Sequence, residues 1–223
     1  TWKDNAGVTH EQSIPPTLLA TAIGQINDVN LCVSSDFKKN SNRIAVVGVS
    51  TTELGGSHLS VIRRVTGGDV PKVDFEKCKE VFRNIYRLNQ QRLLASCHDL
   101  SDGGLGVALA EMAIGGGLGA TVDLAKIPFH DLQKTLKHDD LIDLLKVAFA
   151  ETPGRFLIEV NEQDAAAVES TLGSVPWSWI GHVTENNVLT ICCGDHSIIS
   201  QTSVVTLATA WRKQSNTQTS GTN

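Results

Sequence analysis

The stretch Cys97-His98-Asp99-Leu100-Ser101-Asp102-Gly103-Gly104 follows the apolar residues Leu93 to Ala95 and leads into a helix-like segment, Leu105 to Ile114. This order predicts a strand, a tight turn and a helix, as in folds that mix strands and helices. At the start of a helix, free backbone N–H groups and the positive end of the helix dipole point outward, so this turn is suited to bind phosphate. The structural alternative is that Ser101 or Asp102 only caps the helix.

Two acidic residues of this stretch, Asp99 and Asp102, offer carboxylates to a divalent cation, which commonly accompanies a bound polyphosphate. If Leu100 points into the core, Asp99 and Ser101 lie on the same side of an extended segment, so that one can meet a metal and the other a phosphate. The alternative is that Asp99 pairs with a basic side chain and Asp102 caps the helix. The basic side chains considered for that pairing are Arg43 and Arg155.

A second glycine loop, Gly55-Gly56-Ser57-His58, follows a buried-strand candidate at residues 43–50. Paired glycines let a ligand approach the backbone closely. A plain turn into the helix-like segment Leu59 to Val65 explains the loop about as well. Neither glycine loop matches the Walker A or dinucleotide-binding pattern.

Other residue types at these loops have both a functional and a structural interpretation. His58 and His98 are candidates for acid–base chemistry, although histidines beside strands are more often structural. Cys97 is a candidate nucleophile, but a buried thiol is the favoured interpretation. The turn Glu151 to Phe156 places Arg155 where it could reach an anion, although a structural role is favoured there as well.

The composition excludes several classes of protein. The 223 residues are 41% hydrophobic and 19% charged, which is typical of a globular chain with a normal core. The formal net charge of −5 leaves no broad basic surface, so neither nucleic acid nor an anionic membrane is an expected partner. Five cysteines without zinc-type spacing favour a reduced, cytoplasmic setting. No apolar run of about 18 residues and no signal peptide is visible.

Hydrophobic periodicity and turn residues predict the order of the elements. The expected strands are residues 18–24, 43–50, 93–97, 120–124, 154–160, 179–183 and 188–192. The expected helices are residues 75–88 with Asp74 as the cap, 105–114, 139–150, 162–172 and 202–211. The turn-rich tetrapeptide at residues 184–187 indicates a hairpin between the last two strands. Together the elements predict an α/β (α+β) fold, a mixed β-sheet flanked by helices.

Four segments of the chain, taken in order, resemble one family. They are SIPPTLLATAIGQINDV, TTELGGSHLS, LLASCHDLSDGGLGVALAEMAIGGGLGATVDL and ETPGRFLIEV. They span about residues 12–193, and Ala210-Trp211 resembles the segment that closes the domain. On these segments the chain resembles the C-terminal part of the phosphoribosylformylglycinamidine synthase family, the ATP-dependent amidoligases of purine biosynthesis.

The resemblance implies a domain of the aminoimidazole ribonucleotide (AIR) synthetase superfamily and a fragment of a longer enzyme. Residues 1–13 would be an arm from an absent upstream domain, 14–212 the AIR synthase-related C-terminal domain, and 213–223 a polar, disordered tail. The complete enzyme of the family makes formylglycinamidine ribonucleotide from formylglycinamide ribonucleotide, using ATP and glutamine-derived ammonia. The chain holds no catalytic residue of that reaction, so alone it is expected to be inactive. Its implied partners are the upstream domains, a glutaminase domain or subunit, and the small-molecule substrate.

The resemblance also assigns ligands to individual residues. Asp99 matches the family's magnesium-binding aspartate, and Ser101 matches a serine that contacts ATP or ADP in an auxiliary nucleotide site. Gly103 and Gly104 complete that turn. Gly55, Gly56 and Ser57, followed by His58, match the family's glycine loop near the ligand cleft.

Two other functions remain open on the sequence. One is a different member of the superfamily: AIR synthetase, selenophosphate synthetase or the hydrogenase-maturation ATPase. The segment Ile14-Pro15-Pro16-Thr17 and the segment ETPGRFLIEV favour the purine amidoligase over these. The other is a non-catalytic nucleotide-binding or scaffold domain whose turn at residues 101–104 only caps a helix.

Overall fold

The computed structural model describes residues 1–11, 13, 18–129, 140–194 and 197–217. Its strands are β1 (Trp2–Lys3), β2 (Thr9–His10), β3 (Arg43–Val47), β4 (Ser96–Asp99), β5 (Gly119–Asp123), β6 (Phe156–Val160), β7 (Trp177–Thr184), β8 (Val188–Cys193) and β9 (Ser197–Ser203). Its helices are α1 (His58–Arg63), α2 (Phe75–Gln90), α3 (Gly104–Gly116), α4 (Leu141–Phe149), α5 (Ala165–Leu172) and α6 (Val204–Thr217), with 3-10 turns at Val29–Leu31, Leu124–Lys126 and Glu162–Asp164. None of the helices described is long and apolar enough to span a bilayer.

Seven strands form one mixed sheet in the order β4-β6-β3-β7-β5-β8-β9. Neighbouring strands pair antiparallel except β5 and β8, which pair parallel. This arrangement confirms the predicted mixed sheet with flanking helices. The sheet belongs to a compact unit of residues Leu31–Asn223, and Thr1–Asn30 form a separate unit.

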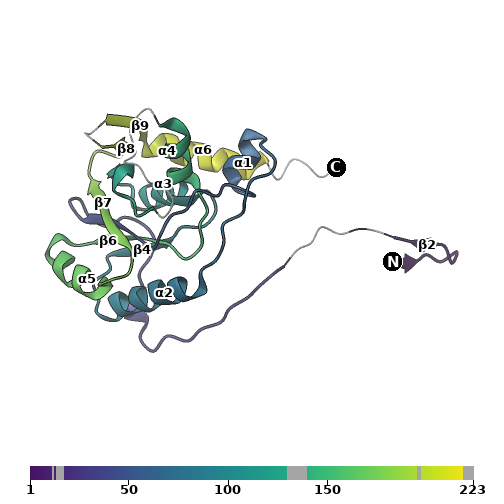
Figure 1. Ribbon diagram of the computed structural model, residues 1–223, viewed down its shortest axis with the longest axis horizontal. Coiled ribbons are helices and arrows are strands. Elements are labelled where there is room, and N and C mark those ends of the chain that lie inside the picture. Colours follow the sequence, from purple (N-terminus) through teal and green to yellow (C-terminus); the bar gives the residue numbers. More distant parts are fainter. Residues whose placement is uncertain (12, 14–17, 130–139, 195–196, 218–223) are drawn as a thin grey trace. The chain divides into compact units, whose positions relative to one another are not determined.

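Helices cover both faces of the sheet, so that strands in its middle are buried on two sides (Figure 1). On one face Ala45 and Val47 of β3 pack in a cluster that includes α2 and α5. On the other face Ile44 and Val46 pack in a cluster that includes α3 and α4. Because successive side chains of a strand point to opposite faces, a strand covered on both sides is apolar on both, as residues 44–47 of β3 are.

Helix α2 follows the predicted capping and periodicity. The Asp74 carboxylate accepts a hydrogen bond from the Lys77 backbone N–H at 3.1 Å, which confirms Asp74 as the cap. Val81 and Leu88 are buried against the sheet, but Phe75 and Phe82 of the same predicted apolar face are exposed. Only part of the apolar face that the sequence predicts for this helix is therefore buried in the core.

Three predictions about strands were wrong. Residues 18–24 form no strand: in this extended segment Leu18 is 92% exposed, and the described residues offer it no pairing partner. The predicted hairpin between β7 and β8 does not form, because β5 lies between them and pairs with both. Strand β9 was missed, and the last helix begins after it, at Val204.

The compact units do not test the domain limits expected from the sequence, which stay predictions. The unit that holds the sheet begins at Leu31. Helix α6 continues to Thr217, into the expected tail, because extending an existing helix adds one hydrogen bond for each residue ordered. Residues 14–17, 139 and 218–223, on which other predictions fall, lie outside the described part of the chain.

The first unit contains a small two-stranded ribbon within the predicted arm. Strands β1 and β2 pair antiparallel, with Trp2 opposite His10. Their rings stack with centroids 4.5 Å apart. The Asp4 carboxylate accepts hydrogen bonds from the backbone N–H groups of Ala6 and Val8 and lies 2.9 Å from the His10 ring, so these contacts lower its pKa.

A buried carboxylate on β6 fastens the loop that precedes β3. Glu159 is 0% exposed, and its oxygens accept hydrogen bonds from the backbone N–H groups of Lys38 and Lys39 at 2.9–3.1 Å. They also accept from the Asn42 amide at 2.7 Å and the Ser96 hydroxyl at 2.8 Å. Several donors are needed because a buried charge without hydrogen bonds costs several kcal/mol.

A buried guanidinium just before β6 fastens the turn that follows α4. Arg155 is 1% exposed and donates hydrogen bonds to the carbonyls of Thr152 (3.0 Å) and Ala150 (2.5 Å) and to the Ser50 hydroxyl (2.8 Å). Burial lowers its pKa to about 10, which leaves the group charged at neutral pH. Its donors point into the protein, which supports the favoured structural role, and the alternative contact with an anion is not available.

Removal of the Arg155 side chain is expected to destabilise the fold strongly. Arg155→Ala leaves two carbonyls and a hydroxyl without their donor in a buried space, and we expect the free energy of unfolding in urea to fall by about 3–5 kcal/mol. Arg43→Ala is the matched control, because Arg43 pairs with Glu162 at the surface. For it we expect a loss of about 1 kcal/mol. Equal losses for the two variants would contradict the structural role of Arg155.

The cysteines are expected to differ sharply in reactivity. All five thiols are free; Cys32 is exposed, whereas burial raises the pKa of Cys97 to about 12. At pH 8 only about one Cys97 in ten thousand would be a thiolate, the form that reacts with iodoacetamide. Mass spectrometry after brief alkylation of the folded chain should find Cys32 modified first and Cys97 unmodified. Comparable rates would show that Cys97 is not shielded.

Candidate functional site

The phosphate turn predicted from the sequence joins β4, an edge strand of the sheet, to α3. Leu100 is buried, whereas Asp99 and Ser101 on either side of it are exposed, as the alternation of an extended segment predicts. The Asp99 side chain is 66% exposed, and its ion-pair partner among the described residues is the His98 imidazole at 3.7 Å. It is therefore accessible, and it does not pair with Arg43, which bonds Glu162, or with the buried Arg155.

The start of α3 shows why two glycines are needed there. Gly103 precedes the helix with φ +75° and supplies no side-chain cap, so neither Ser101 nor Asp102 caps α3 as the structural alternative supposed. A Cβ on Gly104 would lie 2.5 Å from the carbonyl oxygen of Ala150. The backbone amides are also in use, since Gly104 N–H donates to the Ser101 carbonyl at 3.0 Å. A Cβ on Gly103 would meet the Val107 side chain, so both glycines face the protein itself.

The second glycine loop, residues 53–58, leads into α1. Ser57 is buried; its hydroxyl donates to the Leu54 carbonyl at 2.7 Å and accepts from the Ser60 N–H at 3.3 Å, so it caps α1. Gly55 N–H donates to the Asp69 carbonyl at 2.9 Å. Gly56 is exposed and has φ +75°, so it is the member of this loop open to a ligand. Gly55 and Ser57 are buried and bonded within the chain, and their predicted binding role stays a prediction.

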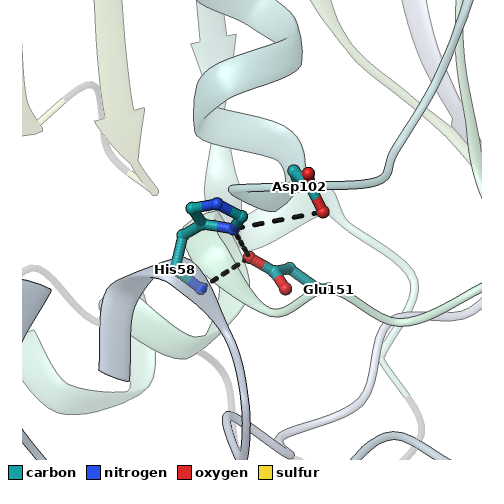
Figure 2. Close-up of side chains that lie close together, drawn as sticks. All are labelled: His58, Asp102 and Glu151. Carbon is teal, nitrogen blue, oxygen red and sulfur yellow. Dashed lines mark hydrogen bonds and ion pairs between the residues drawn. The ribbon is translucent and has the colours of Figure 1, made fainter. Parts of the chain in front are cut away.

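Glu151, which follows α4, holds the two loops together. Its Oε1 accepts hydrogen bonds from the backbone N–H of His58 and of Gly103, each at 2.8 Å, and lies 3.2 Å from His58 Nδ1. The Glu151 side chain is 17% exposed. Figure 2 shows His58, Asp102 and Glu151 pointing toward one another from three separate segments. The structure thus brings together the two loops that the sequence singled out separately.

The role of Glu151 was missed by the sequence analysis. The sequence does contain a signal for this role, because Glu151 lies just two residues after Phe149, the last residue of α4. A negative charge at a helix C-terminus is disfavoured by the helix dipole. An acidic residue at that position therefore indicates that its carboxylate has a partner elsewhere.

The same three side chains lie close enough together to form a candidate cation site. One ligand atom from each of His58, Asp102 and Glu151 can be chosen so that all lie within 4.8 Å of one another. However, Oε1 of Glu151 already accepts from two amides and faces the imidazole, and Asp102, 85% exposed, lies 4.0 Å from His58 Nδ1. The geometry is that of a hydrogen-bonded link between loops.

The other candidates for chemistry have structural surroundings. His98 Nδ1 donates to the Asp99 carbonyl at 2.6 Å, and its Nε2 lies 3.0 Å from Glu111 Oε2. His58 and His98 therefore each have a carboxylate partner of their own. Cys97 is partly buried, and burial raises its pKa, which favours the structural interpretation of this thiol over a nucleophile.

Comparisons with known proteins agree on one family. The family model described as AIR synthase related protein, C-terminal domain, matches residues 42–193. The phosphoribosylformylglycinamidine synthase subunit PurL of Thermococcus sibiricus is 34% identical over 179 residues, which is 80% of this chain and 23% of that protein. PurL of Alkaliphilus metalliredigens is 30% identical over 207 residues, or 92% of this chain and 26% of that protein. The chain thus spans about a quarter of the length of these curated relatives.

Solved structures share the fold at lower identity. PurL of Thermotoga maritima complexed with FGAR has a TM-score of 0.69 and 18% identity over 81% of this chain and 30% of that one. Structures of the same protein are described as complexes with ATP and with ADP. Escherichia coli HypE, a hydrogenase maturation protein, has a TM-score of 0.55 and 17% identity over 76% of this chain and 51% of its own. The family model matches more than half of the residues of this chain. The chain therefore belongs to the AIR synthase related protein family, as a C-terminal domain.

Proposed function

We propose that this chain is the C-terminal domain of a phosphoribosylformylglycinamidine synthase and forms one wall of a nucleotide-binding cleft. The observation that carries the proposal is the similarity to PurL subunits along four fifths or more of the chain. The complete enzyme would convert formylglycinamide ribonucleotide to formylglycinamidine ribonucleotide with ATP and ammonia derived from glutamine.

The nucleotide would meet the turn at residues 99–104. The exposed Asp99 carboxylate would hold Mg²⁺, which neutralises phosphate charge when bound, and the exposed Ser101 hydroxyl would contact the nucleotide. Because the amides of Gly103 and Gly104 are paired within the chain, these glycines would contribute space rather than hydrogen bonds. The ATP and ADP complexes of Thermotoga maritima PurL support a nucleotide as the ligand of this fold.

The chain would work only with partners. Its relatives are about four times longer, so we infer that further domains supply the catalytic residues and the opposite wall of the cleft. The Thermotoga protein has been solved as a PurLQS assembly, which supports a separate glutaminase subunit as the source of ammonia. On this proposal the 223-residue chain alone has no synthase activity.

The other members of the superfamily are less well supported. The likeness to HypE is one of fold, at 17% identity, whereas two PurL subunits are 30–34% identical to the chain. The scaffold alternative differs in an observable way, because a scaffold domain would bind no nucleotide.

Calorimetry with Mg²⁺ and ADP tests the assignment of Asp99. We expect the unaltered chain to bind Mg·ADP, and Asp99→Ala to weaken binding about tenfold or more, because the metal loses its protein ligand. We also expect EDTA to reduce the affinity of the unaltered chain to that of the variant.

The matched control for this experiment is Glu162→Gln, which removes an exposed carboxylate that pairs with Arg43 on the surface. Its affinity for Mg·ADP should equal that of the unaltered chain. Equal weakening in both variants would contradict a specific role of Asp99 in holding the metal. The absence of binding to the unaltered chain would favour the scaffold alternative.

A further inference from the structure

One carboxylate oxygen connects the starts of two helices that lie far apart in the sequence. Glu151 Oε1 accepts the backbone N–H of His58, the first residue of α1, and that of Gly103, the residue before α3. Hydrogen bonds from amides to an ionised carboxylate are about twice as strong as neutral ones. With 17% of its side chain exposed, Glu151 is shielded enough for them to matter.

The position of Glu151 is the one that an anionic ligand would take. Amides at the starts of helices attract negative charge, and here a carboxylate of the same chain satisfies two of them. The turn that carries Asp99 and Ser101 is therefore fastened at Gly103, and the exposed Gly56 is fastened through His58. Without the carboxylate, both amides would lack this partner and the loops would be free to separate.

We propose that Glu151 is a positioning residue of the nucleotide site: it fixes the glycine loop against the turn at residues 99–104, so that Asp99 and Ser101 meet the ligand from a fixed backbone. This inference rests on the proposed function. Glu151 does not touch the nucleotide. It acts through the two amides, and its second contact, the His58 imidazole, is not required for that action.

Three variants separate the possible roles of this side chain. Glu151→Ala removes the acceptor, Glu151→Gln keeps a neutral oxygen that can accept both amides, and Glu151→Asp keeps the charge on a shorter side chain. The matched control is Glu111→Ala, which removes the carboxylate of another Glu–His pair, with His98, beside the same turn. Circular dichroism and thermal unfolding establish that each variant is folded.

Two measurements are made on the 223-residue chain: Mg·ADP affinity by calorimetry, and the backbone amide NMR signals of His58 and Gly103. For Glu151→Ala we expect affinity to fall about tenfold, both amide signals to move, and their hydrogen exchange to accelerate. Glu151→Gln should restore most of the affinity, which a loss of charge alone would not allow. Glu151→Asp should lie between the two. Glu111→Ala should match the unaltered chain, and should Glu151→Ala not fold, the Gln and Asp variants carry the comparison.

Two results would overturn the inference while leaving the proposed function in place. If the unaltered chain binds Mg·ADP and Glu151→Ala binds it equally or more tightly, the carboxylate does not position the site and at most competes with phosphate. If the amide signals of His58 and Gly103 are unchanged in Glu151→Ala, the link does not exist in solution. Failure of the unaltered chain to bind Mg·ADP, by contrast, overturns the proposed function and the inference with it.

Discussion

The buried guanidinium of Arg155 is the constraint on which the surroundings of the site depend. It binds two carbonyls of the turn after α4, those of Ala150 and Thr152, and the hydroxyl of Ser50 beyond the end of β3. Its own backbone carbonyl accepts the N–H of Leu100, the first residue after β4. In the described part of the chain no carboxylate pairs with this charge, so the carbonyl dipoles must remain in place to compensate its burial. The ends of β3, α4 and β4 are thereby held to one another.

The segment that contains Arg155 carries two further charges with separate roles. Glu151 fastens the starts of α1 and α3, and Glu159 fastens the loop before β3. Because β6 lies between β4 and β3 in the sheet, side chains on it and just before it reach loops on both sides. The segment ETPGRFLIEV therefore explains much of the architecture around the two glycine loops, although its residues were expected mainly to form a turn and a strand.

Local sequence signals predicted well where helices and strands form, but they predicted poorly which strands pair with each other. The apolar run of β3 and the cap and periodicity of α2 are properties of contiguous residues, and both were confirmed. The false hairpin between β7 and β8 had an equally good local signal at residues 184–187. The turn residues carry no information about β5, which comes far earlier in the chain and pairs with both β7 and β8. The same limit applies to the site, since a glycine that meets a backbone, such as Gly104, has the same local signature as one that meets a ligand.

The paired amides change how the turn can hold a phosphate. Three carboxylates, those of Asp99, Asp102 and Glu151, lie on or beside the turn. Among the described residues their ion-pair partners are the imidazoles of His58 and His98, and no lysine or arginine pairs with them. A polyphosphate approaching this surface alone would meet like charges within a few ångströms, an unfavourable interaction of about 1–4 kcal/mol per pair at 4 Å between water and the protein surface. The amides of Gly103 and Gly104 are already engaged, so these two backbone donors cannot offset that repulsion. A divalent cation between Asp99 and the phosphate would turn this repulsion into attraction, so the geometry favours a nucleotide that brings its metal over a nucleotide alone.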